Sequence, residues 1–208
     1  MSLDSYYAPI GRGESQLTEK RSRFLGFCLP ASSEDEAKAQ IAETRAKFSD
    51  ARHVVWAYIL PDGTSRASDD GEPQGTAGAP LSEQLRRAEL RGAIVLVVRY
   101  FGGILLGPGG LRRAYSEAAA SAVEDAPKQT VRQMAQYSVS VPYSAQALIK
   151  NAVLSHGGTV SACDYGENVK IAALFSEENP EGFLAAVRDA TNGASEAVFC
   201  GISAVSEA

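Results

Sequence analysis

The run AIVLVVRYF (93–101) constrains the fold more than any other stretch of this chain. Its first six residues are all apolar, whereas a strand with one face in water alternates apolar and polar side chains. We therefore expect a buried strand. Arg99 lies at its end, where an unpaired charge would be costly, so Arg99 should meet a carboxylate.

Five glycines and a proline follow in FGGILLGPGG (101–110). Such permissive backbone is needed where a chain bends sharply or is approached closely. Glycines before a helix can expose amide groups to a phosphate, and they can equally serve a turn from strand to helix. Because neither GxxxxGK[ST] nor GxGxxG is present, we favour the turn.

A second loop, SDDGEPQGTAGAP (68–80), holds the carboxylates Asp69, Asp70 and Glu72. Clustered carboxylates can bind a hard cation such as Mg²⁺, and they can equally accept hydrogen bonds from turn amides. The second role is the commoner one, so we assign no metal and no cofactor. This loop is also the densest source of carboxylates for Arg99, and the pair would join the two loops in one surface.

His53 precedes the apolar stretch VVWAYIL. Three roles are open to this residue: a base, a ligand or a hydrogen-bonded residue at the rim of the site. Without a partner in the sequence we favour the rim residue. No Ser-His-Asp signature, GxSxG elbow, HExxH or CxxC motif is present. Cys28, Cys163 and Cys200 lie far apart, which is typical of reduced, buried thiols in a cytosolic protein.

Charge is unevenly distributed along the 208 residues, whose net charge is −5. Residues 1–130 hold 16 Lys and Arg against 17 Asp and Glu, whereas residues 131–208 hold 4 against 8. The acidic balance disfavours indiscriminate nucleic-acid binding, and it places any anion-binding face in the first part. No apolar run approaches the ~20 residues of a membrane span, and we expect no secretory signal.

The stretch EDAPKQT (124–130) interrupts a helical pattern and indicates a linker. We therefore predict two domains, residues 1–127 and residues 131–208. The fold class is α+β.

The second domain has the pattern β-α-β-β-α-β, which is the ferredoxin-like arrangement. Ser144 is a candidate N-cap for its first helix and Gly157 the end of that helix. A hairpin is expected at Gly166-Glu167, and Asn179-Pro180 begins a second helix that Gly193 ends. Strands are expected at 131–141, 159–165, 168–175 and 195–205.

The first domain mixes strands and helices. A capping box at Ser33 and Glu36 begins an amphipathic helix over 33–48. Further helices are expected from Pro80 to Arg91 and from about Leu111 onward. Strands are expected at 20–30 and 53–60, beside the one at 93–101.

SDDGEPQGTAGAP followed by VVRYFGGILLGPGGLRRAY closely resembles the hallmark of the IMPACT/YigZ family, and RHVVWAY and KRSRF match its weaker upstream elements. The resemblance implies an N-terminal domain like domain 2 of ribosomal protein S5. It also implies a ferredoxin-like C-terminal domain resembling one in elongation factor G. Eukaryotic relatives regulate translation through protein–protein contacts in the amino-acid starvation response. Leu105 departs from the Lys usual in the family, which weakens a phosphate or nucleic-acid role.

We expect a cytoplasmic, non-catalytic binding or regulatory protein associated with translation or the stress response. Its partner would be a protein of the translation machinery or its regulators, with at most weak contact to RNA or the ribosome and none to a membrane. The alternatives are an RNA- or ribosome-binding module and an enzyme acting on a phosphorylated or nucleotide substrate. The residues expected to form the binding surface are His53, Asp69, Asp70, Gly71, Glu72, Gly75, Thr76, Arg99, Tyr100, Phe101, Gly102, Gly103, Gly109, Gly110 and Arg112.

Overall fold

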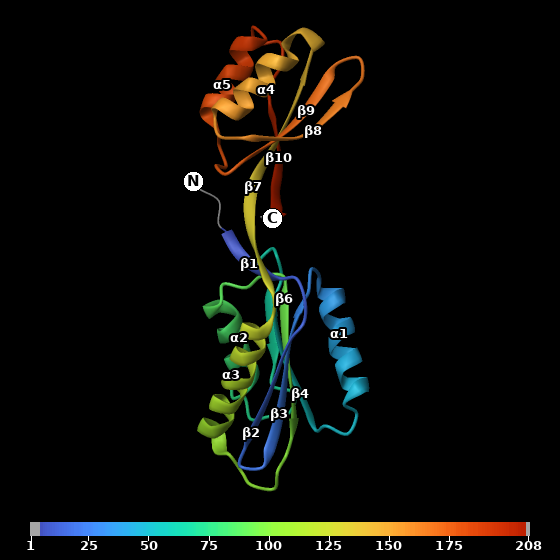
Figure 1. Ribbon diagram of the computed structural model, residues 1–208, viewed down its shortest axis with the longest axis vertical. Coiled ribbons are helices and arrows are strands. Elements are labelled where there is room, and N and C mark those ends of the chain that lie inside the picture. Colours follow the sequence, from blue (N-terminus) through green and yellow to red (C-terminus); the bar gives the residue numbers. More distant parts are fainter. Residues whose placement is uncertain (1–4, 207–208) are drawn as a thin grey trace. The chain divides into compact units, whose positions relative to one another are not determined.

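The computed structural model describes residues 5–206 as a mixed α/β protein with two antiparallel sheets and five α-helices (Figure 1). The chain divides into two compact units, one of residues 6–130 and one of residues 131–206 together with Ser5. Between residues 5 and 206, no helix combines the length and the apolar character that a membrane crossing requires. Each unit has its own hydrophobic core.

The sheet of the N-terminal unit is antiparallel throughout. Its strands, in spatial order, are β2 (Gly13–Glu19), β3 (Ser22–Pro30), β6 (Ala93–Tyr100), β4 (His53–Ile59) and β5 (Ser65–Ser68). The short strand β1 (Ser5–Pro9) runs beside the segment after α2, where the Tyr7 amide donates to the Glu89 carbonyl oxygen. The apolar strand β6 is therefore central, as its composition predicts.

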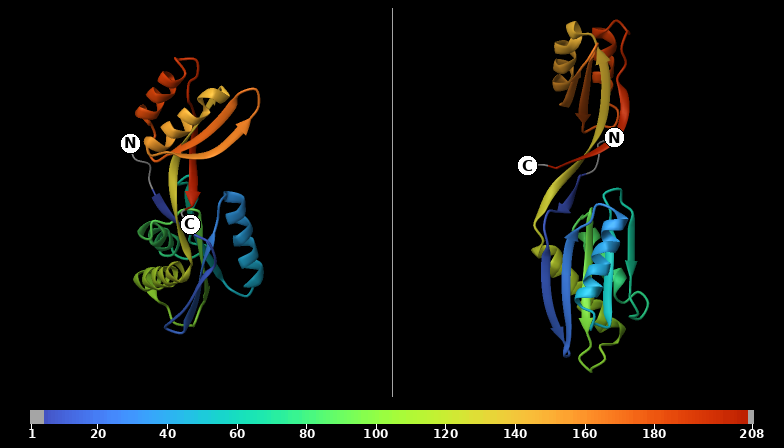
Figure 2. Two further views of the ribbon diagram at one scale, coloured as in Figure 1. Left: turned by 45° about the horizontal axis from the view of Figure 1, so that its top comes forward. Right: turned by 90° about the vertical axis from the view of Figure 1, so that its right-hand side faces the viewer.

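Helices cover both faces of this sheet (Figure 2). Helices α2 (Gly78–Arg87) and α3 (Gly107–Asp125) pack on one face, and α1 (Glu34–Lys47) packs on the other. Val95 and Val97 of β6 join the core under α2 and α3, whereas Ile94, Leu96 and Val98 join the core under α1. The alternation continues to the end of the strand, so Arg99 faces α3 and Tyr100 faces α1.

Local predictions at the helix ends of this unit need correction. Helix α3 begins at Gly107 rather than near Leu111. Ser33 caps α1 by accepting a hydrogen bond from the Glu36 amide at 3.2 Å, but the Glu36 carboxylate bonds to Ser32, which offers an amide and a hydroxyl to one oxygen. Helix α2 ends at Arg87 rather than at Arg91. Glu89 adopts a left-handed conformation there, with φ of 52°, and the chain turns to run along β1.

The elements of the C-terminal unit follow the predicted β-α-β-β-α-β order. They are β7 (Lys128–Val141), α4 (Gln146–Ser155), β8 (Thr159–Tyr165), β9 (Val169–Phe175), α5 (Glu181–Ala190) and β10 (Val198–Ser206). The strands lie in the order β8-β9-β7-β10, with all pairings antiparallel. Phe175 and Phe183 pack in the core, with ring centroids 4.7 Å apart.

Several boundaries in this unit differ from prediction. Ser144 is no N-cap, because a 3₁₀ turn over Tyr143–Ala145 precedes α4. Helix α5 begins at Glu181, one residue after Pro180. Strand β7 begins at Lys128, inside the predicted linker, where the Lys128 ammonium donates to the Glu124 and Ala126 carbonyl oxygens at the end of α3.

The cysteines also differ from prediction in their exposure. All three thiols are free, but Cys28 alone is buried, Cys163 is half-buried and Cys200 is exposed on β10. Burial raises the pKa of the Cys28 thiol to about 12. Sparse spacing therefore did not imply burial for all of them.

Candidate functional site

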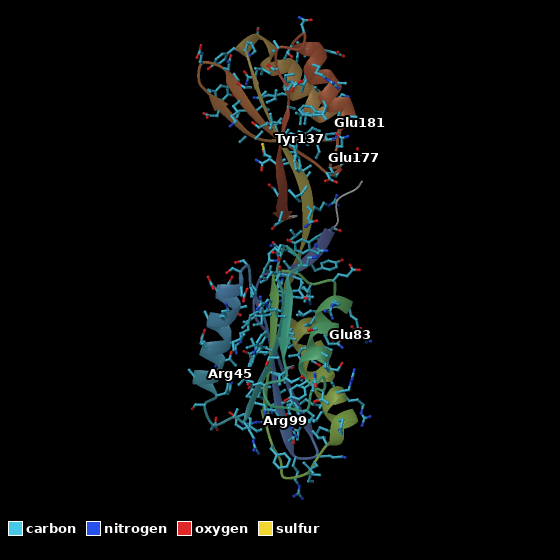
Figure 3. The ribbon with its side chains drawn as sticks, turned by 180° about the vertical axis from the view of Figure 1, so that it is seen from behind. Arg45, Glu83, Arg99, Tyr137, Glu177 and Glu181 are labelled. Atoms are coloured by element: carbon cyan, nitrogen blue, oxygen red, sulfur yellow. The ribbon has the colours of Figure 1, made fainter. Side chains whose placement is uncertain are left out.

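Arg99 lies near the end of β6 in the N-terminal unit (Figure 3). It forms a buried ion pair with Glu72. Arg99 Nη1 donates to Glu72 Oε1 at 2.6 Å, and the two side chains are only 7% and 4% exposed. The Tyr115 hydroxyl of α3 donates to the same oxygen at 2.8 Å. This confirms that Arg99 meets a carboxylate of the 68–80 loop, and it adds a tie to α3 that the sequence did not indicate.

The guanidinium of Arg99 has further contacts around it. Arg99 Nη2 donates to the Ser22 hydroxyl at 3.4 Å, and the rings of Phe24 and Phe101 lie with their centroids 5.5 and 5.6 Å from its central carbon. The Nε–H group has no hydrogen-bond acceptor among residues 5–206. Arg99 is thus held by the 68–80 loop, by β3 and by the loop after β6, and its buried Nε–H group has no partner in the described part of the chain.

Burial raises the pKa of the Tyr115 hydroxyl, and the negative charge of Glu72 raises it further. Tyr115 therefore remains a protonated donor toward Glu72. Its ring packs edge-on against Phe24 at 5.1 Å. The role of this tyrosine is to hold the carboxylate in place.

Asp70 joins the loop to strand β4. Its carboxylate accepts from the Val54 amide at 2.6 Å and forms an ion pair with Arg45 of α1. The Asp70 carbonyl oxygen lies 2.7 Å from His53 Nδ1, and because a carbonyl only accepts, Nδ1 carries the hydrogen. This bond orients the imidazole, and it leaves Nε2 at 4.0 Å from Glu72 Oε1.

Asp69 closes the loop onto the start of α2. Its carboxylate accepts three backbone amides, from Gly75 at 2.8 Å, Ala77 at 2.9 Å and Gly78 at 2.8 Å. Burial acts to raise the pKa of Asp69, but the three hydrogen bonds outweigh it and the pKa is lowered. All three acidic residues of the loop are therefore engaged by the protein itself. Over residues 5–206, no three His, Cys, Asp or Glu side chains gather as metal ligands.

A cavity of about 330 Å³ lies between the two loops. His53, Glu72 and Arg99 supply its polar lining, and Arg52 also lines it. The apolar lining comes from Pro73, Phe101, Leu105, Leu106, Pro108 and Leu111, with the backbone of Gly107. Beside the cavity, the loop after β6 exposes Phe101, Ile104 and Leu105, the last with 83% of its surface in solvent. We call Phe101, Ile104 and Leu105 the apolar rim.

The structure brings only some of the predicted site residues to this cavity. His53, Glu72, Arg99 and Phe101 line it. Tyr100 lies on the opposite face of the sheet, where its hydroxyl donates to Asp50 at 2.8 Å. The remaining predicted residues shape the loops, lie in α3 or line another groove: Asp69, Asp70, Gly71, Gly75, Thr76, Gly102, Gly103, Gly109, Gly110 and Arg112.

The five glycines between residues 101 and 110 have different roles, and two of them, Gly103 and Gly107, adopt positive φ of 82° and 69° where the chain turns. A Cβ on Gly102 would lie 2.0 Å from the backbone carbon of Arg21, so this position needs glycine for close approach to the β2–β3 turn. Gly109 and Gly110 instead lie at the start of α3, within the helix. The glycines thus serve a strand-to-helix turn, the alternative favoured on sequence.

Sequence reasoning missed most of the apolar lining. Arg52 lies in RHVVWAY, and Pro73, Leu106, Gly107 and Pro108 lie in the two loop motifs, but nothing in these motifs singled out their side chains. The expectation that the two loops form one surface is the signal that pointed to this wall.

Comparison with known proteins gives the family. Residues 20–123 match the Impact N-terminal domain, and residues 139–194 match a domain of unknown function, DUF1949. The chain is 32% identical over 196 residues to the IMPACT family member YvyE of Bacillus subtilis, covering 93% of this chain and 90% of that protein. It is 33% identical over 178 residues to the IMPACT family member YigZ of Escherichia coli, covering 84% and 87%.

A solved structure described as that of a hypothetical protein aligns with a TM-score of 0.64 and 29% identity, covering 95% of this chain and 97% of the other. The Impact N-terminal match lies within the N-terminal unit, the DUF1949 match lies within the C-terminal unit, and both relatives cover more than four fifths of the chain. The chain belongs to the IMPACT family.

Proposed function

We propose that this chain is a non-catalytic binding protein with a regulatory role in translation or the stress response, acting in the cytoplasm. It binds a protein partner of the translation machinery or its regulators at the cavity and the apolar rim. The observation that carries the proposal is the continuity between the solvent-exposed rim and a concave apolar cavity at the meeting point of the two loops. Such combinations favour ligand or partner binding.

The polar groups of the cavity support binding rather than chemistry. Glu72 Oε1 is already occupied by Arg99 and Tyr115, so an apolar side chain can enter without stranding a free charge. The lining holds no Ser, Thr, Cys or Lys side chain to act as a nucleophile. These features favour a binding protein over an enzyme acting on a phosphorylated or nucleotide substrate.

Domain analogies support the link to translation. We assign the N-terminal unit to the class of ribosomal protein S5 domain 2, and the C-terminal unit to the ferredoxin-like class found in elongation factor G. The strand order β8-β9-β7-β10 is consistent with the second assignment. A protein partner is favoured over RNA because the net charge is −5 and because Leu105 stands where the family usually has Lys.

A pull-down from lysate of the source organism, with and without nuclease, tests the proposal. We expect the wild-type chain to capture a translation protein that survives nuclease. Leu105→Asp should reduce capture by about tenfold or more, as truncation of a central apolar contact does in other interfaces. Ile10→Asp is the matched control, because Ile10 is another exposed apolar residue of the same unit, at 58% exposure. Capture that nuclease abolishes, or that Leu105→Asp leaves intact, would refute the proposal.

A further inference from the structure

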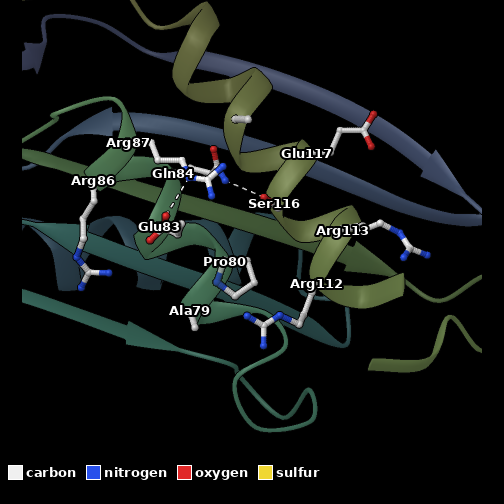
Figure 4. A pocket seen from close by; sticks show the side chains of 11 residues that line it. Ala79, Pro80, Glu83, Gln84, Arg86, Arg87, Arg112, Arg113, Ser116 and Glu117 are labelled. Atoms are coloured by element: carbon white, nitrogen blue, oxygen red, sulfur yellow. Dashed lines mark hydrogen bonds and ion pairs between the residues drawn. The ribbon is translucent and has the colours of Figure 1, made fainter. Parts of the chain in front are cut away.

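A second concave surface lies in the N-terminal unit, between α2 and α3 (Figure 4). This groove has a volume of about 830 Å³ and shares no lining residue with the cavity described above. Gln84 of α2 donates to the Ser116 hydroxyl of α3 at 2.7 Å and so links the two walls. Ala79 and Ala120 contribute small side chains to the lining. The groove is therefore a concave surface on which a ligand can lie.

Arginines stand on both walls of this groove. Arg86 and Arg87 come from α2, and Arg112 and Arg113 come from α3 (Figure 4). Arg87 is engaged by Glu83 at 2.9 Å. No carboxylate of residues 5–206 pairs with the other three, all of which are exposed. The groove thus offers three guanidinium groups with free hydrogen-bonding capacity.

One helix end adds to this positive charge. Helix α3 has no acidic residue in its first turn, so the partial positive charge of its N-terminus is not neutralised by the helix itself, whereas the Asp69 carboxylate already accepts the Ala77 and Gly78 amides at the start of α2. Pro80, in the first turn of α2, and Arg112 of α3 both line the groove (Figure 4). Arg86 lies in the last turn of α2, where a cation stabilises the helix, whereas Arg112 and Arg113 lie in the N-terminal half of α3 and gain nothing from its dipole.

We infer that the groove binds an acidic segment of a protein, through carboxylates held by Arg86, Arg112 and Arg113. The planar fork of a guanidinium fits a carboxylate with two parallel hydrogen bonds. Glu83 and Glu117 interrupt the positive lining and would repel the continuous charge of a nucleic-acid backbone. Acidic side chains spaced along a peptide can bind the arginines and still lie away from Glu83 and Glu117. This surface is independent of the apolar cavity and extends the proposed function to a second contact.

Fluorescence anisotropy on the full chain tests the inference with three labelled probes: a Glu-rich peptide, the same peptide with Gln for Glu, and single-stranded RNA of the same charge. We expect the Glu-rich peptide to bind best and to weaken as salt is raised from about 50 to about 200 mM. The double variant Arg112→Glu, Arg113→Glu should bind it at least about tenfold more weakly, since each reversal replaces attraction by repulsion. Arg86→Glu, on the other wall, should weaken it independently.

Two variants serve as controls. Arg188→Glu makes the same charge change as Arg86→Glu, at an exposed position of helix α5 in the C-terminal unit, and should leave binding unchanged. Leu105→Asp should also leave peptide binding unchanged. The peptide experiment therefore tests the groove alone, and the pull-down with Leu105→Asp tests the cavity alone. The inference is overturned if the Glu-rich peptide does not bind, if it binds the double variant equally, or if RNA binds the wild-type chain more tightly than the peptide does.

Discussion

Arg99 is the residue on which the two loops depend, because its charge is buried and its main partner, Glu72, is buried too. Arg99→Leu would leave the Glu72 carboxylate buried with Tyr115 as its remaining donor. Removing one partner of a buried ion pair costs ~3–5 kcal/mol, so we expect the free energy of unfolding to fall by about that amount. Urea denaturation measures it, and amide hydrogen exchange should become faster in residues 68–80.

A second variant separates charge from packing. Arg99→Leu combined with Glu72→Gln removes the stranded charge and keeps an acceptor for the Tyr115 hydroxyl. We expect this double variant to be more stable than Arg99→Leu alone. Equal stability of the two would contradict the ion-pair role given to Glu72.

The contribution of the Asp69 carboxylate to stability can be tested through its dependence on pH. Its folded pKa is lowered, so its stabilising contribution is present above the unfolded pKa of ~3.9 and is lost as pH falls through the folded value. Asp69→Asn places an amide N–H group against one of the three loop amides and should cost ~1–3 kcal/mol at neutral pH. The difference in unfolding free energy between the two chains should shrink below about pH 4. A difference that stays constant down to acid pH would show that the carboxylate charge plays no part.

At the scale of elements, the segment between β6 and α3 sets the shape of the cavity. Gly102→Ala would force a Cβ into the backbone of Arg21, so the loop must shift away from the β2–β3 turn. We expect a loss of ~1–3 kcal/mol, as for overpacking elsewhere, measured by thermal or urea unfolding.

Gly109→Ala is the matched control within the same segment. A Cβ on Gly109 meets no atom within 4 Å, and the residue lies inside α3. Alanine should therefore be tolerated or should stabilise the chain by up to ~1 kcal/mol. If both substitutions were equally harmful, close approach at Gly102 would not explain its glycine.

The sequence predicted those elements whose apolar pattern is strong. The uninterrupted apolar residues of β6 predicted a strand buried on both faces, and β6 lies between two cores. The alternating apolar residues of β9 predicted a strand with one buried face, as observed. The sequence missed β1, β2 and β5, because short strands and edge strands with polar side chains resemble loops. It named the class of partner for Arg99 but not Glu72 itself, because the choice among three neighbouring carboxylates depends on turns that the sequence does not fix. The cavity wall was missed for a related reason, since Leu106 and Pro108 meet His53 only in the folded chain.

At the scale of the whole molecule, we predict two domains joined near residues 126–131. The chain separates into two compact units at Thr130 and Val131, and helix α3 ends at Asp125. Limited proteolysis should cut near this junction and release a C-terminal fragment that keeps its secondary structure by circular dichroism. A fragment that unfolds on release would argue for one cooperative domain.

Photo-crosslinking most directly tests binding of a protein partner at the cavity and the apolar rim. The photoreactive amino acid p-benzoylphenylalanine would replace Leu105 on the rim, and Ile10 in a control chain, both of which are exposed. Irradiation of living cells should give a covalent adduct with a protein of the translation machinery or its regulators from position 105 and none from position 10. No adduct at position 105, or adducts with RNA alone, would contradict the assignment of this surface to a protein partner.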